Sequence, residues 1–139
     1  MEKPVLTRFK TPFESLMNRP VEIALSNGEE RRGILYLNPP GRLLLVAEGA
    51  PLVVNAAAVV GIVATGPKID DFRPGREQYG DLVDFLTKGV RVALTTSGEW
   101  EGILVDVSPM GAEWLGIQKP DGSTVFVPSA AVATVELIP

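Results

Sequence analysis

The sequence predicts a mainly β protein built from two copies of one small antiparallel unit, each copy preceded by a short helix. The first observation is an internal repeat, because residues 21–25 and 33–35 recur 69 positions later as residues 90–94 and 102–104. The second is that Val, Leu and Ile fall in short alternating or apolar runs bounded by turn residues, which is typical of short strands. A duplicated β unit follows from these two observations together.

A later segment of the repeat sets the boundaries of the two copies. Residues 54–59 recur 73 positions later as residues 127–132, so the second copy carries four additional residues. Each copy is about 60 residues, near the lower size for an independent core. The predicted organisation is a first module over residues 1–66, a linker over 67–80 and a second module over 81–139.

Turn and capping residues predict the elements of the first module. Thr11 can cap a helix, Pro12 fits its first position and Glu14 completes a capping box, so a short helix is predicted to end near Asn18. Asn-Gly at residues 27–28 predicts a hairpin. The predicted strands are 21–25, 31–38, 43–47, 52–54 and 59–64.

The second module repeats this order. Asp81 is the predicted cap of a helix that extends to Thr87. Lys-Pro-Asp-Gly at residues 119–122 predicts a turn between the third and fourth strands. The predicted strands are 90–95, 100–107, 113–118, 123–127 and 132–137.

Composition excludes several classes of function. The chain contains no Cys and no His, which excludes disulfides, thiolate or imidazole metal ligands and a Ser-His-Asp triad, so no cofactor and no enzymatic activity are predicted. No apolar run approaches the length of a membrane span, and the first residues lack the apolar core of a signal peptide, so a cytoplasmic location without membrane contact is expected.

Charge is unevenly divided between the modules. Residues 1–66 sum to +1 and residues 81–139 to −5, within a net charge of −4 for the chain. Nucleic-acid binding draws much of its affinity from basic surfaces. Only the first module could therefore hold a basic patch.

A short helix followed by five strands, with Val-x-Ile-x-Leu-x-Asn-Gly and a glycine five residues later, resembles the Sm-like fold of Sm, LSm and Hfq proteins. The matching residues of the first module are Val21, Ile23, Leu25, Asn27, Gly28, Gly33 and Leu35. Those of the second are Val90, Val92, Leu94, Gly98, Gly102, Leu104 and the strand over 125–128. The resemblance implies two tandem, small, bent, five-stranded antiparallel barrels.

The nucleotide-contacting motifs of that family are degraded here. The loop after the second strand, which carries an acid and an asparagine in Sm proteins, is 38–42 in the first copy and 108–111 in the second, and Asn38 and Arg42 are partial substitutes at most. The second family motif, Arg-Gly or Lys-His, is replaced by Asn55-Ala56-Ala57 and by residues 128–130. These departures weaken the RNA inference without weakening the fold inference.

The resemblance also implies assembly, because Sm-like modules form rings of six or seven by pairing the fourth strand of one module with the fifth strand of the next. Open barrels leave strand edges that must be paired, covered or charged. A homo-oligomer is predicted, with three copies giving a six-module ring, and the competing interpretation is a monomer of two mutually packed modules. The candidate interface residues are Leu52, Val53, Val54, Val59, Val60, Val125, Phe126, Val127 and Val132.

Two functions from different classes remain open. The first is an oligomeric module that binds single-stranded RNA through the first repeat, with Arg19, Arg31, Arg32, Asn38, Arg42 and Asn55 as candidate contacts. Tyr36, Trp100 and Trp114 could stack on bases, or fill a core or an interface. The alternative is a protein-interaction or assembly scaffold that keeps the fold and has lost RNA binding. No small-molecule substrate is inferred.

Overall fold

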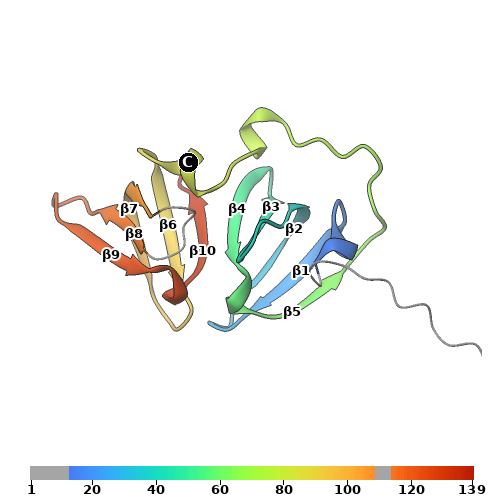
Figure 1. Ribbon diagram of the computed structural model, residues 1–139, viewed down its shortest axis with the longest axis horizontal. Helices are drawn as coiled ribbons and strands as arrows, with labels where there is room; N and C mark the ends of the chain where they lie inside the picture. The colour runs from blue at the N-terminus through green and yellow to red at the C-terminus, as the bar shows by residue number, and fades with distance from the viewer. Residues whose placement is uncertain (1–12, 109–113) are drawn as a thin grey trace, which may run out of the picture.

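The computed structural model describes residues 13–108 and 114–139, which form one ten-stranded antiparallel sheet. The strand order is β5-β1-β2-β3-β4-β10-β6-β7-β8-β9, so β4 and β10 lie side by side at the centre and β5 and β9 at the two ends (Figure 1). The strands are β1 Pro20–Leu25, β2 Glu30–Leu37, β3 Arg42–Ala47, β4 Ala50–Asn55, β5 Val59–Ala64, β6 Gly89–Leu94, β7 Glu99–Val107, β8 Trp114–Gln118, β9 Thr124–Pro128 and β10 Val132–Leu137. The mainly β prediction is confirmed.

The two repeats share not only the order of their strands but also their register. Leu25 pairs with Val59 across β1 and β5, next to a bulge, and Leu94 pairs with Val132 across β6 and β10, next to the same bulge. The second and third strands of each repeat also share one irregularity, at Tyr36 in the first and at the equivalent position in the second. The paired strand positions of one repeat therefore have structural counterparts in the other.

Closed barrels are not present in the described residues. The five strands of each repeat form one half of a single open sheet, because β4 pairs with β10 of the second repeat rather than with β5 of its own. The two predicted modules are therefore joined by a continuous hydrogen-bonded ladder.

The predicted helices are single 3-10 turns, η1 (Glu14–Leu16) and η4 (Leu82–Phe85). A positive φ ends each segment, 60° at Asn18 and 69° at Thr87, and the amides of these residues then bond to carbonyls of β2 and β7. One turn is too short to sustain an α-helix by its own hydrogen bonds, so capture by the adjacent strand decides its form. Thr11 and Pro12, the predicted cap and first helical residue, lie outside the described residues.

A close backbone approach explains the glycine within the second strand of each repeat. A Cβ on Gly33 would lie 2.7 Å from the carbonyl oxygen of Val46 on β3. A Cβ on Gly102 would collide with the carbonyl oxygen of Gln118 on β8. Both positions allow two strands to curve tightly against each other.

The apolar core is shared between the repeats. One buried cluster combines Tyr36, Leu44, Val46 and Val53 of the first repeat with core residues of the second, including those of η4 and β10. The other lies within the first repeat and includes Ala133 of β10. The repeats therefore bury each other's apolar faces.

The connections between strands are short, apart from the linker that joins β5 to β6. Among the described residues, three further 3-10 turns are η2 (Ala56–Ala58), η3 (Arg76–Gln78) and η6 (Ser129–Ala131). The linker arches from β5 over the top of the sheet and contains η3 (Figure 1). In the part of the chain that the structure describes, no helix has the length and apolar character needed to cross a membrane.

Candidate functional site

The central feature is the junction at which β4 of the first repeat pairs with β10 of the second. Val54 lies opposite Thr134, Val53 opposite Val135 and Leu52 opposite Glu136. All of these except Glu136 are buried. Leu52, Val53, Val54 and Val132, which the sequence singled out as interface residues, lie at this contact within one chain.

Two ion pairs cross this junction. Arg31 on β2 donates from Nη2 to Oε2 of Glu136 at 2.8 Å, and Nη1 reaches Oε1 at 3.4 Å. Arg42 on β3 donates from Nε to both carboxylate oxygens of Asp81, at 2.8 and 3.0 Å, and its Nη2 also contacts Oδ2. Charge-assisted bonds of this geometry are stronger than neutral ones. These pairs fix the second repeat and the end of the linker on the first repeat.

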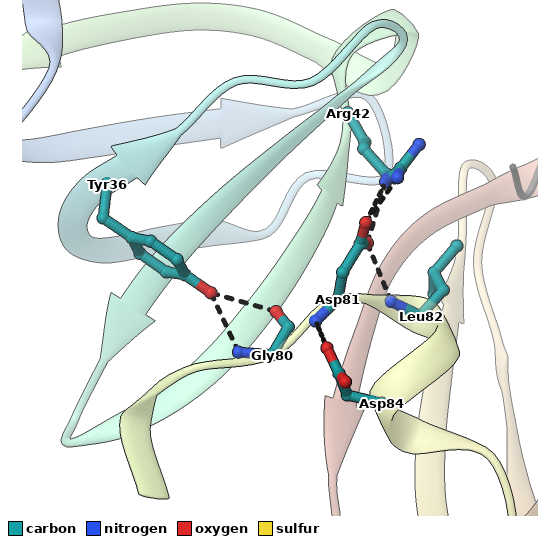
Figure 2. A network of polar contacts seen from close by, with 6 residues as sticks. All are labelled: Tyr36, Arg42, Gly80, Asp81, Leu82 and Asp84. Carbon is teal, nitrogen blue, oxygen red and sulfur yellow. Dashed lines mark hydrogen bonds and ion pairs between the residues drawn. The ribbon is translucent and has the colours of Figure 1, made fainter. Parts of the chain in front are cut away.

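A polar network holds the end of the linker (Figure 2). The Tyr36 hydroxyl donates to the carbonyl of Gly80 at 2.9 Å and accepts from its amide at 3.2 Å. Asp81 also accepts from the amide of Leu82 at 2.7 Å, and Asp84 accepts from the amide of Asp81 at 2.9 Å, which completes the predicted cap as a capping box. Burial raises the pKa of the Tyr36 hydroxyl, and the hydrogen bond with Gly80 opposes this shift. These contacts, which we call the linker lock, therefore have a structural role: they hold the end of the linker on the first repeat.

The other residues proposed for RNA contacts also have partners within the chain. Arg19 donates from Nε to the carbonyl of Gly66 at 3.1 Å. Arg32 pairs with Glu22 at 3.4 Å on the surface of the sheet. The Asn55 amide nitrogen donates to the carbonyls of Val132 at 2.8 Å and Ser129 at 3.2 Å, and its Oδ1 caps η2.

Arg42 and Asn55 lie opposite each other across β3 and β4, and both reach into the second repeat. Asn38 lines a shallow hollow of about 470 Å³ with Leu37, Pro39, Leu44, Tyr79 and Asp81. Arg31 and Arg42, two of the arginines that the sequence proposed as RNA contacts, thus contact carboxylates of the second repeat.

The two ends of the sheet are the second feature. Among the described residues, β5 and β9 each have a neighbouring strand on one side only. Val63 on β5 is 58% exposed and Phe126 on β9 is 56% exposed, and Val60 is also exposed. Apolar side chains on an unpaired edge favour pairing with another chain. The predicted interface residues Val59, Val60, Val125, Phe126 and Val127 lie on these two edges.

The three residues proposed for stacking lie in different environments. Tyr36 is buried, and its ring centroid lies 5.3 Å from that of Tyr79. Trp100 is half-buried, with Lys119 Nζ 5.5 Å from its ring centroid. Trp114 is exposed at the start of β8. Residues 109–111, part of the second loop compared with the Sm motif, lie outside the described residues.

The carboxylates that line two hollows of the surface, Asp81 and Asp84, have structural partners within the chain. A second hollow, of about 540 Å³, is lined by Pro74, Arg76, Tyr79, Asp84 and Lys88. Asp81 and Asp84 both accept backbone hydrogen bonds. Within residues 13–108 and 114–139, no group of three acidic side chains could hold a metal ion.

No protein-family model matches this chain, and no curated protein matches it.

Sequence reasoning missed the partners of the junction. Glu136 and Tyr36 showed no local signal for their roles, since Arg31 and Glu136 are 105 positions apart and Tyr36 and Gly80 are 44 apart. Asp81 was recognised as a cap, and capping is the only part of its role that depends on neighbouring residues.

Proposed function

We propose that this chain is a non-enzymatic, Sm-like assembly module whose copies join head to tail, with β9 of one copy pairing with β5 of the next. The observation that carries the proposal is which strands form the two free edges. By the register of the repeats, β9 is the counterpart of β4 and β5 is the counterpart of β10. β4 and β10 are the two strands that pair at the centre of the sheet.

Burial at the internal junction supports the same conclusion. Phe126 is exposed, whereas its counterpart Val53 is buried by the second repeat. Val60 is exposed, whereas its counterpart Ala133 is fully buried. A second copy on each edge would bury these side chains as the internal contact buries their counterparts, and burial of apolar surface favours association.

Head-to-tail pairing generates either a closed ring or an open filament, depending on the rotation between neighbours. The Sm-like resemblance favours closure, with three copies supplying six repeats. A ring of this kind leaves no free strand edge, which removes the tendency of exposed edges to aggregate.

Single-stranded RNA binding remains the second prediction for this chain. Assembly is favoured over it because Arg31, Arg42 and Asn55, three of the candidate RNA contacts, already bond to the second repeat. Arg32 is the most exposed of the arginines in the ion pairs. A sequence-independent contact through one exposed arginine supplies little affinity at moderate salt.

Sedimentation velocity over a range of protein concentrations tests the proposal. The expected result is a discrete species of three times the 14.9 kDa chain mass. Phe126→Lys places a charge on the β9 edge and should shift the protein to the monomer. Val83→Lys is the matched control, because Val83 is 63% exposed on η4, which is not part of either free edge. A wild-type chain that stays monomeric at all concentrations would refute the proposal.

A further inference from the structure

We infer that the β9 edge accepts the β5 edge of a second copy in a single register, and that apolar contacts at Trp100 and Trp114 replace there the two ion pairs of the internal junction. The inference rests on the proposed function and adds the contacts and the specificity of the interface. The two kinds of junction would then alternate around the assembly, one charged and one apolar.

The register follows from the counterparts. β5 and β10 are related by 73 positions, because Val59 corresponds to Val132. β4 and β9 are related by the same number, because Asn55 corresponds to Pro128. Transfer of the internal pairing then places Gly61 opposite Val127, Ile62 opposite Phe126 and Val63 opposite Val125.

Both residues of the first ion pair, Arg31 and Glu136, are replaced by apolar residues at the proposed contact. Trp100 is the counterpart of Arg31, since they pair with the equivalent residues Val92 and Ile23. Val63 is the counterpart of Glu136. An arginine facing valine would leave a partly buried charge without a partner, and a glutamate facing tryptophan would keep only the longer contact with Arg91, at 3.5 Å. Replacement of both members keeps the two surfaces complementary.

The second ion pair shows the same replacement on the β9 side. Trp114 occupies the position of Arg42, since each is the first residue of its strand and pairs with the last residue of the next strand. Trp114 is exposed, whereas Arg42 is covered by the second repeat. The sequence offers no acid for this position, because the residue 69 positions before Asp81 is Pro12, which lies outside the described residues.

The apolar side chains next to these positions also have a similar total size in the two repeats. The buried residues Leu44 and Val53 correspond to Gly116 and Phe126, which have the same total number of side-chain carbons. The Phe126 ring lies over Gly116, where a Cβ would be 3.2 Å from Cε1 of the ring. The exchange of a large and a small residue keeps a surface of the size that the second repeat covers on β3 and β4.

The difference between the charged junction and the apolar junction restricts each strand edge to one partner. Pairing of β4 with β5 would set Arg31 against Val63, and pairing of β9 with β10 would set Trp100 against Glu136. The first mismatch leaves Arg31 partly buried without its carboxylate, and the second leaves Glu136 with only Arg91, at 3.5 Å, whereas the internal pair and the proposed pair lose no contact. Mismatches of this kind provide specificity by penalising the wrong partner. The assembly therefore keeps a strict alternation of first and second repeats.

Charge exchange at the proposed contact provides the test. Val63→Glu and Trp100→Arg should each raise the protein concentration at half-assembly at least about tenfold, because each leaves one charge at the interface unpaired. The double variant Val63→Glu/Trp100→Arg should return this concentration to within about threefold of wild type. β5 is an end strand and β7 belongs to the other repeat, so recovery reports a contact between copies. Val83→Glu is the control and should leave assembly unchanged.

Cysteine cross-linking tests the register without the need to introduce charges. The chain contains no Cys, so an introduced pair is the only source of disulfides. Val63→Cys/Val125→Cys should form covalent oligomers on mild oxidation, and Val63→Cys/Val127→Cys, two residues out of register, should not. Two results would overturn this inference and leave the proposed function intact, provided that the wild type assembles. One is equal cross-linking by the two cysteine pairs. The other is a double charge variant whose effect on assembly is the sum of the effects of the single variants. A wild type that never assembles would overturn both.

Discussion

Removal of the charge of Asp81 tests how strongly the linker lock stabilises the fold. In Asp81→Asn the amide can still cap η4, because Asn and Asp are comparable caps. The change therefore isolates the ion pair with Arg42. These side chains are 17% and 24% exposed for Arg42 and Asp81, which places the pair between a surface contact and a buried one.

The magnitude follows from that intermediate burial. Exposed ion pairs contribute about 0.2–1 kcal/mol, and loss of one member of a buried pair costs about 3–5 kcal/mol. We expect Asp81→Asn to lower the free energy of unfolding by about 2 kcal/mol, which corresponds to a melting temperature lower by about 7 °C for a chain of this length. Asp81→Ala should cost about 1 kcal/mol more, because it also removes the cap.

Urea denaturation measures these changes, in the Phe126→Lys background so that assembly does not add to the apparent stability. Arg42→Met should match Asp81→Asn, and the double variant should cost little more than either single change, since both remove one contact. Arg32→Met is the control, because Arg32 is 80% exposed and its pair with Glu22 should contribute less than about 0.5 kcal/mol. A loss below about 0.5 kcal/mol for Asp81→Asn, or additive losses in the double variant, would refute the role assigned to this pair.

Two further predictions concern alkaline pH and RNA. The pKa of Tyr36 is raised in the folded chain, so its contribution to stability is complete below about pH 10, the pKa of an unfolded tyrosine, and is lost as the pH rises through the folded pKa. Tyr36→Phe should cost about 1–2 kcal/mol at neutral pH and weaken the loss of stability above pH 10, as measured by urea denaturation at pH 8 and pH 11; an unchanged alkaline loss would exclude Tyr36 as its source. Fluorescence anisotropy with A-rich and U-rich single-stranded RNA should show no salt-sensitive binding at moderate salt, because Arg31 and Arg42 are engaged with carboxylates. Micromolar binding that is lost in Arg31→Glu/Arg32→Glu would instead support the RNA function.

The strands could be predicted from the sequence because their signals are local. Turn residues such as Asn27-Gly28 and Lys119 to Gly122 mark strand ends, and alternation marks the strands between them. The repeat doubled the evidence for each strand. The bounds of β1, β2 and the other strands fall within two residues of prediction where the chain is described.

The path of the sheet through the molecule could not be predicted in the same way. Nothing near Leu52 or Val135 in the sequence indicates that their strands pair within one chain rather than between copies, because the two arrangements satisfy the same edges. The same limit applies to side chains. Arg31 beside Glu30 is typical of a solvated hairpin, and only the return of β10 supplies Glu136 as its partner.

The continuous ladder across the internal junction also bears on the role of the linker. Since β4 and β10 hold the repeats together through backbone bonds, shared core and ion pairs, the part of the linker that precedes Gly80 mainly keeps their local concentration high. A break in the peptide chain between Lys68 and Arg73 would then leave two fragments that recognise each other and recombine. By the same reasoning, a chain in which the second repeat precedes the first should fold into the same sheet.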